Sequence, residues 1–196
     1  MKKYLLLPAL ALLFLASSSQ ASILFSPKPV DLGFENIQQE GPNWCWAAIV
    51  QQVLTWRGQS NPPTQCQLVT EANRDRGETA NNCCEAGDQL PAACDRPGNN
   101  LEVMTLVNRY GGRVDGVQMP DTPEQVHEYL AAGRALAVGL DTGETVGHVI
   151  LIRGIVWENG EAMLLVNDPI VKQSIKTPFS SSRPSWKTTQ TISRSL

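Results

Sequence analysis

Residues 43–56 read NWCWAAIVQQVLTW, and this stretch decides the fold. Its apolar residues recur at steps of three and four, the spacing of one helix face, at Ile49, Val53, Leu54 and Trp56. Gly58 follows the run, where a helix commonly ends. The stretch therefore predicts a helix that carries Cys45 at its N-terminus.

The chain around this helix divides into loops and further helices. Prolines punctuate residues 22–43, which predicts irregular chain, and a shorter helix is expected after Pro63-Thr64. Residues 75–100 are rich in Asn, Gly, Asp and Pro, which is typical of a loop. Two capping boxes predict two more helices, Asn99 with Glu102 before residues 101–110, and Thr122 with Gln125 before the helix of residues 123–132.

After Gly133 the pattern changes to that of strands. The β-rich runs are 135–140, 147–157 and 161–167, with further strands expected at 171–176 and 186–192. Asn159-Gly160 predicts a tight hairpin turn between the second run and the third. Helices followed by an antiparallel sheet predict an α+β domain, with the Cys45 helix packed on the sheet.

The N-terminus has the features of a secretory signal peptide. Lys2 and Lys3 precede an apolar run over residues 4–16, and Ser19-Gln20-Ala21 fits a small-x-small cleavage site. The alternative is a membrane anchor, but 13 apolar residues are short for a span of roughly 20. We therefore expect cleavage after Ala21, leaving residues 22–196 as one exported domain, periplasmic or extracellular.

Length and charge narrow the class of this mature chain. Removal of 21 residues from 196 leaves 175, enough for one well-formed core. Loss of two lysines moves the formal net charge from −3 to −5. A mildly acidic chain without a basic run gives no electrostatic reason to expect nucleic acid. No later stretch reads as membrane-spanning, so no membrane contact is expected after cleavage.

The five cysteines are an odd number for an exported chain. Four lie between residues 66 and 94, namely Cys66, Cys83, Cys84 and Cys94, whereas Cys45 stands apart. Export favours disulfides, which predicts two bridges in the cluster and one free thiol at Cys45. Adjacent cysteines fit disulfide geometry poorly, so Cys66 and Cys94 would each take one of the vicinal pair, in an order the sequence leaves open. Zinc is the alternative, although the cluster lacks paired C-x2-C spacing.

A nucleophilic cysteine needs a base, and the chain has two histidines. His127 lies in the middle of a predicted helix, opposite Val126 and Leu130, which favours a solvated surface position. His148 opens a strongly apolar strand after Gly147, and a strand is a rigid platform for a base. The other interpretation of His148 is a buried structural histidine at a strand end. The unpaired thiol in the same chain favours His148 as the base.

The base needs an orienting partner, and the reaction needs an oxyanion stabiliser. In a hairpin centred on the predicted turn, residue i pairs with about 319−i, which brings Asp168 and Asn167 near His148. Asp168 is preferred because a carboxylate also stabilises an imidazolium, and Asn167 is the alternative. The Cys45 backbone N–H is one oxyanion donor, with an amide from Gln38 or Gln39 as the other.

These residues together resemble the papain-like cysteine peptidases. That family has a glutamine, then Cys-Trp-Ala opening a helix, then a histidine leading an apolar strand, then Asn or Asp, and all four elements occur here in that order. The NWCWAA form and the compact size are closer to its small secreted bacterial branch. That branch includes proteases of pathogens and is related to double-glycine peptidases that trim bacteriocin leaders.

The resemblance, which extends from about Gln38 to Pro169, implies a role for each residue. Cys45 would be the nucleophile, His148 the acid and base, Asp168 the orienter and Gln39 an oxyanion donor. It implies a protein or peptide substrate, no cofactor and no metal, and it allows for a cognate inhibitor or immunity protein. Trp44 departs from the plant-type pattern, which has a small residue there, and residues 22–37 are too few for a conventional propeptide.

Proteolysis is the leading hypothesis, and two alternatives remain beside it. Deamidation, transglutamination and cell-wall peptide cleavage use the same Cys-His-Asp machinery, although the cell-wall enzymes favour a different nucleophile motif. A catalytically inactive binding or effector scaffold would keep the helices and sheet without a working thiol. All four positions carry competent residues, which favours an enzyme.

Overall fold

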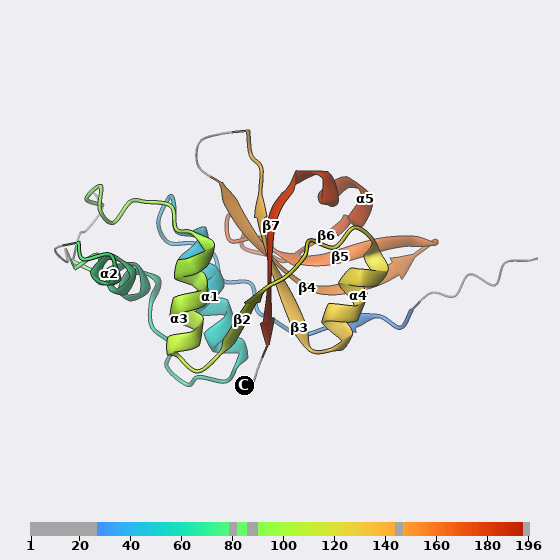
Figure 1. The fold of residues 1–196 in the computed structure, drawn as a ribbon, viewed down its shortest axis with the longest axis horizontal. Helices are drawn as coiled ribbons and strands as arrows, with labels where there is room; N and C mark the ends of the chain where they lie inside the picture. Colours follow the sequence, from blue (N-terminus) through green and yellow to red (C-terminus); the bar gives the residue numbers. More distant parts are fainter. Residues whose placement is uncertain (1–26, 79–81, 86–89, 144–146, 194–196) are drawn as a thin grey trace, which may run out of the picture.

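The computed structural model describes residues 27–78, 82–85, 90–143 and 147–193 and has the expected α+β architecture (Figure 1). The helices are α1 (Cys45–Trp56), α2 (Gln65–Asp75), α3 (Asn100–Arg109), α4 (Pro123–Ala131) and α5 (Phe179–Ser182), which continues into a 3-10 turn at Arg183–Ser185. The strands are β1 (Val30–Asp31), β2 (Arg113–Gly116), β3 (Arg134–Leu140), β4 (His148–Glu158), β5 (Glu161–Asn167), β6 (Ile175–Pro178) and β7 (Trp186–Ser193). The proposed signal peptide, residues 1–21, lies outside the described residues.

Within the described ranges the strands form one antiparallel sheet of seven. Its order is β2-β7-β3-β4-β5-β6, with β1 paired to β4. Asn159 and Gly160, with φ of 51° and 83°, form the predicted turn between β4 and β5. The chain returns as β7 between β2 and β3, so the C-terminal strand is an interior strand of the sheet, next to the edge strand β2.

Local sequence accounts for the helices. Side chains at the start of α2, α3 and α4 form complete capping boxes, with Thr64, Asn99 and Thr122 at the N-cap. Helix α1 has no side-chain cap among the described residues, and it is apolar around most of its circumference. A helix of that kind is stable only when it is buried, and Ala47, Ala48 and Ile49 are fully buried.

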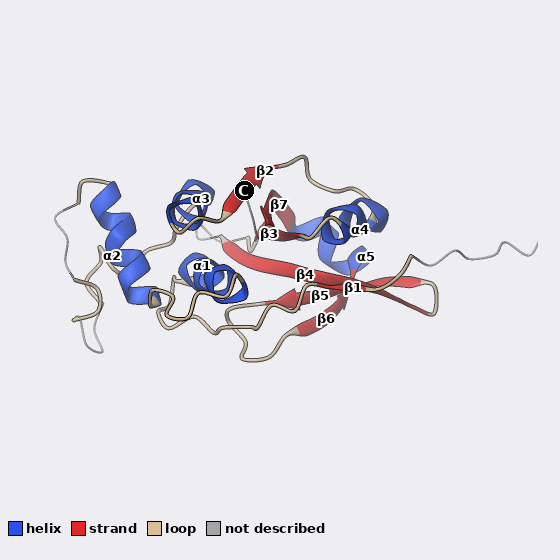
Figure 2. Cartoon of the chain, turned by 90° about the horizontal axis from the view of Figure 1, so that it is seen from below, coloured by secondary structure: helices blue, strands red, loops and turns tan. Residues whose placement is uncertain are grey.

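Both faces of the sheet are covered, which explains the continuous apolar runs in β3 and β4. Ala135 and Ala137 of β3 pack in the core beneath α1 and α3, whereas Leu136 and Val138 pack with α4 on the opposite face. Figure 2 shows α2 at one end of the molecule, outside α1 and α3, with α4 over another part of the sheet. On the face of the sheet that α1 covers, the N-terminus of α1 lies at the end of the sheet where β4 begins.

Several sequence expectations need correction. The strand expected at 171–176 begins later, at β6, because residues 168–171 form a turn after β5. The region expected to be irregular before α1 contains β1, which pairs with β4 at Gly154; a β-carbon there would lie 2.5 Å from the Val30 carbonyl oxygen. Strand β2 and helix α5 were not predicted, since both are short and lack periodicity.

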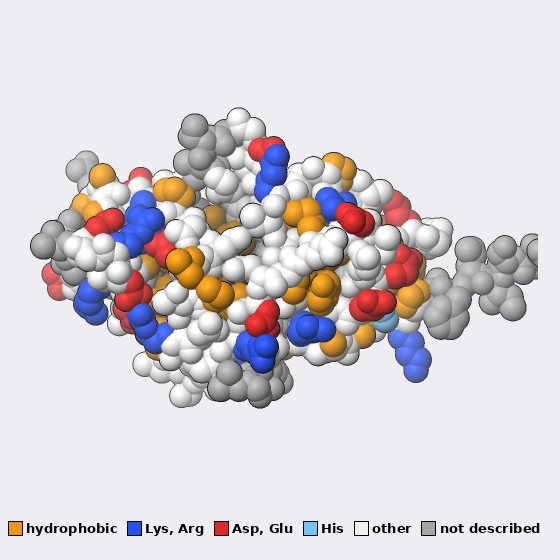
Figure 3. Space-filling view, viewed as in Figure 1, with side chains coloured by type: hydrophobic (Ala, Val, Ile, Leu, Met, Phe, Trp, Pro, Cys, Tyr) orange, Lys and Arg blue, Asp and Glu red, His pale blue; other side chains and the backbone are white. Residues whose placement is uncertain are grey.

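The surface has mixed charge. On the face in Figure 3, acidic and basic side chains lie beside one another over both halves of the molecule. Among the described residues, the helices are all too short or too polar to cross a membrane.

Candidate active site

Cys45 is the first residue of α1, and two tryptophans fix its backbone. The Trp44 indole N–H donates to the Cys94 carbonyl at 2.7 Å, and that of Trp46 donates to the Arg96 carbonyl at 3.4 Å. The thiol is free, and only 8% of the residue surface is exposed. No described side chain caps α1, so the first N–H groups of the helix, beside Cys45, have no capping side chain as a partner.

His148 lies between Cys45 and Asp168. Its Nε2 is 2.7 Å from Asp168 Oδ1, which leaves Nδ1 for the Cys45 thiol. Burial by itself would lower the pKa of His148, but hydrogen bonds and charge interactions with Asp168 and Cys45 outweigh it and raise the pKa to about 9. The ring is therefore set to carry a proton at neutral pH.

Asp168 follows the last residue of β5 and is held by its neighbours. Its Oδ1 also accepts the Ile170 N–H at 3.0 Å, and its carbonyl oxygen accepts the Asn36 side-chain amide at 3.2 Å. Burial by itself would raise the pKa of Asp168, but the hydrogen bonds from His148 and Ile170 and the charge of His148 hold it below its usual range. The carboxylate is therefore ionised wherever His148 is protonated near neutral pH.

Asn167 does not contact His148. Its amide nitrogen donates to Gln52 Oε1 at 3.0 Å and to the Phe34 carbonyl at 3.3 Å, and its oxygen accepts the Ser174 hydroxyl at 2.6 Å. The structure therefore brings Asp168, and not Asn167, to the ring of His148. Asn167 is instead a fully buried structural residue that joins β5 to α1.

A β-bulge in β4 determines which of the two neighbours, Asp168 or Asn167, shares a face of the sheet with His148. Pairing follows the predicted sum of 319 from Glu158 to Gly154, and then shifts so that Leu151 pairs with Asn167. Leu151 faces α1, so Asn167 faces α1 as well, and the next residue, Asp168, turns to the other face. His148 lies two residues before Ile150 in β4, and Ile150 faces α4, so the side chain of His148 is on the α4 face as well. This is the face to which Asp168 turns. The expected pairing of 148 with 171 does not form, because β5 ends at Asn167.

Gln39 lies beside the pair, but its amide is already engaged. Its Nε2 donates to the carbonyl oxygens of Gly41 and Pro42, at 2.9 and 2.7 Å, and its Oε1 is buried without a partner among the described residues. Gln38 turns away and donates to the Ile170 carbonyl at 3.2 Å. Of the two candidate glutamines, only Gln39 lines the site.

The remaining predicted residues lie away from the site. Disulfides join Cys66 to Cys84 and Cys83 to Cys94, so the zinc alternative is wrong. His127 on α4 is half-buried rather than solvated, because its Nε2 lies 3.0 Å from the Lys28 carbonyl and its ring meets Trp157 edge-on.

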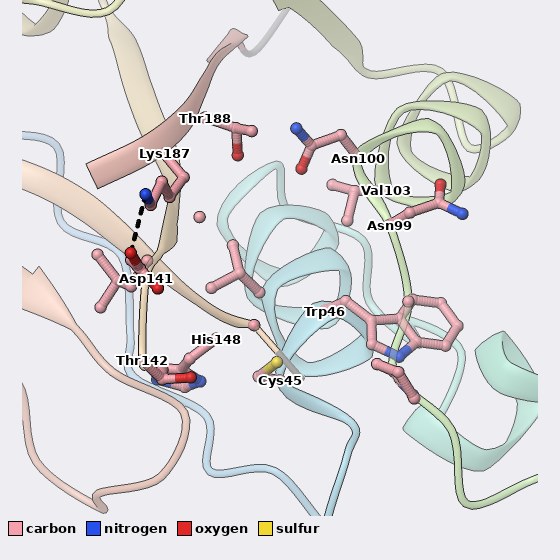
Figure 4. Close-up of a pocket in the computed structure, with 16 residues that line it drawn as sticks. Cys45, Trp46, Asn99, Asn100, Val103, Asp141, Thr142, His148, Lys187 and Thr188 are labelled. Carbon is pink, nitrogen blue, oxygen red and sulfur yellow. Dashed lines mark ion pairs between the residues drawn. The ribbon is translucent and has the colours of Figure 1, made fainter. Parts of the chain in front are cut away.

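Two hollows flank the pair formed by Cys45 and His148. The larger, about 310 Å³, lies between the start of α3 and the β3, β4 and β7 strands, with Trp46, Val103 and Leu140 on its walls (Figure 4). The Lys187–Asp141 ion pair, at 2.8 Å, lies at its edge. The smaller, about 250 Å³, lies on the Gln39 and Ile170 side. Cys45 and His148 line both, as do Thr142 and Gly147.

Residues 31–193 match the Peptidase_C39 like family. The chain belongs to this family of cysteine-type peptidases. The expected relationship to bacteriocin-leader peptidases and the predicted peptidase activity are therefore confirmed at the level of the family. No curated protein sequence matches this C39-like peptidase significantly.

Solved structures confirm the papain-like fold of this C39-like peptidase. The peptidase domain of Streptococcus ComA, a bifunctional ABC transporter of a quorum sensing pathway, has a TM-score of 0.59 and 12% identity over 82% of this chain and 98% of its own. A double glycine motif protease from an AMS/PCAT transporter, in complex with its leader peptide, has a TM-score of 0.53 and 17% identity over 84% and 95%. Digestive procathepsin L 3 of Tenebrio molitor has a TM-score of 0.54 and 10% identity over 84% and 69%.

Sequence reasoning missed the residues that support the site. Arg96 stacks over Trp46 with its guanidinium 5.3 Å from the ring centre, donates to Asn73 Oδ1 at 2.7 Å and pairs with Glu102 at 2.7 Å. Gln52, two turns beyond Cys45, donates to the Ile37 carbonyl at 3.0 Å. The one available signal was a polar residue inside an otherwise apolar helix, which in a buried helix indicates a hydrogen-bonded partner.

Proposed function

We propose that this peptidase hydrolyses peptide bonds of exported polypeptides through Cys45, His148 and Asp168. The observation that supports this most is the position of His148, which is bonded to Asp168 on one side and faces the Cys45 thiol on the other. His148 is placed to exchange a proton with Cys45, and the thiolate is the nucleophilic form of a cysteine. Hollows on both sides of the pair leave space for a peptide chain.

The proposed reaction has two steps. The Cys45 thiolate bonds to the carbonyl carbon, and when the C–N bond breaks the His148 imidazolium gives its proton to the leaving amine. Neutral His148 then takes a proton from water, whose oxygen attacks the thioester carbon. Cleavage of the C–S bond releases a carboxylic acid and restores the thiolate beside the imidazolium.

The negative oxygen formed in each step needs donors. The N–H of Cys45 at the uncapped start of α1 is the first. Gln39 is proposed as the second, which requires its amide to leave the Gly41 and Pro42 carbonyls when substrate binds. Gln39→Ala should then lower kcat by roughly 100-fold or more with little change in KM. An unchanged kcat would remove Gln39 from this role.

The N-terminal segment and the disulfides bear on the location of the enzyme. We propose that residues 1–21 are removed on export and that residues 22–196 act outside the cytoplasm, because two disulfides form most readily there. Amino-terminal sequencing of the mature protein from culture fractions should begin at Ser22. A start at Met1 would contradict export by cleavage.

Incubation of the mature protein with a peptide library, read by mass spectrometry, tests the reaction type. We expect chain scission that disappears in Cys45→Ala, whose fold is checked by its thermal unfolding midpoint. A gain of one dalton without scission would instead identify a deamidase. A Cys45 thiol that reacts with iodoacetamide no faster than a free cysteine would identify an inactive scaffold.

A further inference from the structure

The glycines of the described chain fall into three groups. Seven have positive φ, which L side chains rarely adopt: Gly33, Gly58, Gly77, Gly111, Gly133, Gly143 and Gly160. Five have a neighbour within 3.0 Å of the place a β-carbon would take: Gly41, Gly98, Gly112, Gly139 and Gly154. The two left are Gly116 and Gly147, for which neither backbone conformation nor described packing requires glycine.

Gly147 differs from Gly116 in its position. It precedes His148, it is exposed, and it is one of the few residues that line both hollows beside the catalytic pair. A β-carbon there would meet one described atom within 4 Å, the Leu140 carbonyl oxygen at 3.6 Å, which is an ordinary contact. Apart from its chain neighbours, no other atom of the described residues lies within 4 Å of that position, and Gly147 borders both hollows there.

We infer that Gly147 is a specificity-determining residue whose missing side chain lets the substrate main chain pass from one hollow to the other. The inference rests on the proposed peptidase function and narrows its substrate class. A chain that occupies both hollows has residues on both sides of the bond that is cut, so the enzyme cleaves within extended polypeptides. A β-carbon at position 147 occupies the path of that chain and leaves the thiol and the imidazole in place.

The test compares Gly147→Ala with Gly116→Ala, a matched change at an exposed glycine of strand β2 that lines neither hollow. Two measurements are made on each mature variant. The first is kcat/KM on a library-derived peptide that extends on both sides of the cleaved bond. The second is the rate at which iodoacetamide, which is too small to span the hollows, alkylates Cys45.

We expect Gly147→Ala to lower kcat/KM by on the order of 10- to 100-fold, with alkylation within about twofold of wild type and a similar thermal midpoint. Gly116→Ala should match the wild type in both assays. The inference is overturned if kcat/KM of Gly147→Ala is unchanged. It is also overturned if kcat/KM and the alkylation rate fall equally, because the substitution would then act through His148.

A second probe separates this inference from the proposed function. A double-headed epoxysuccinyl peptide, which carries peptide on both sides of its epoxide, alkylates Cys45 efficiently only after both peptide parts bind in the cleft, so it reports access without turnover. If the wild type cleaves no peptide, the proposed function fails, but the ratio of epoxysuccinyl peptide to iodoacetamide rates still tests Gly147. A ratio unchanged by Gly147→Ala overturns the inference, and a ratio lowered about tenfold or more supports it.

Discussion

Oδ1 of Asp168 lies 2.7 Å from Nε2 of His148, and the same oxygen accepts the Ile170 N–H. The carboxylate thus fixes one ring nitrogen and keeps the ring charged, with the pKa of His148 raised to about 9. The other nitrogen is left to the Cys45 thiol. Two consequences of this contact can be measured, one for activity and one for stability.

Activity should persist into alkaline solution. Because the His148 pKa is about 9, kcat/KM is expected to fall on an alkaline limb near that pH. Asp168→Asn keeps a hydrogen-bonding group but removes the charge, so the limb should move toward pH 6.5 and kcat/KM should fall by roughly 10- to 100-fold. A pH profile of both proteins checks this, and a limb at the same pH in both would contradict it.

Stability should change in the same pH range. The folded-state pKa of His148 is above its ordinary value, so its stabilising contribution is complete below about pH 6.5 and is lost as the pH rises through 9. The pKa of Asp168 is lowered, so its contribution is lost as the pH falls through its folded value. Urea unfolding from about pH 6 to 10 measures the alkaline loss, which His148→Ala should largely abolish.

Asn167 provides a control for Asp168. Asn167→Ala leaves the Gln52 side-chain oxygen and the Phe34 carbonyl without this partner in a buried site. We expect unfolding to become easier by about 1–3 kcal/mol, with the alkaline limb of activity unmoved. A limb displaced as far as in Asp168→Asn would give Asn167 a role in orienting His148.

The two disulfides should differ in their effect on activity. The carbonyls of Cys94 and Arg96 accept the indole N–H groups of Trp44 and Trp46, and residues 97–100 form a wall of the larger hollow. Each disulfide closes a short loop, so its removal should lower the free energy of unfolding by roughly 3 kcal/mol. The two variants to compare are Cys83→Ser/Cys94→Ser and Cys66→Ser/Cys84→Ser. Only the first should also raise KM severalfold. Equal KM values in the two variants would show that the wall of the larger hollow does not depend on the Cys83–Cys94 disulfide.

Arg96 and Glu102 form a buried ion pair beneath that wall. Arg96→Met removes the closer of the two arginines that pair with Glu102 and leaves Arg76 at 3.3 Å, so it should lower the free energy of unfolding by about 3 kcal/mol. Arg96→Met/Glu102→Gln should recover part of this loss, because no uncompensated charge remains. Chemical unfolding of both variants gives the comparison, and a double variant less stable than the single one would contradict it.

Much of the fold could be predicted from local pattern. The helix at 43–56, both capping boxes and the Asn159-Gly160 turn are encoded within a few neighbouring residues, and the structure contains each of them. Strands β1 and β2 could not be found, because two or four residues carry too little periodicity and depend on partners far along the chain.

The site was harder to predict in one respect. The thiol was identified from the odd cysteine, and the base from the apolar strand it opens. The choice between Asp168 and Asn167 depended on the bulge at Arg153, and nothing in the local sequence marks that residue as the extra one. The Gln52, Arg96 and Asn73 contacts were also missed, since their partners come from distant segments.

The same bulge has a consequence for ancestry. A relative that lost Arg153 would keep Leu151 opposite Asn167 and Ile152 opposite Val166, so the aspartate would still share the face of the histidine. A register shift of one residue in this part of the sheet would instead place Asn167 opposite Ile152 and on the face of the histidine, although neither side chain had mutated. The evolutionary step between an aspartate and an asparagine in this role can thus be a change of strand register rather than a codon change. Comparisons that match residues column by column would miss such an exchange unless the two strands were aligned by structure.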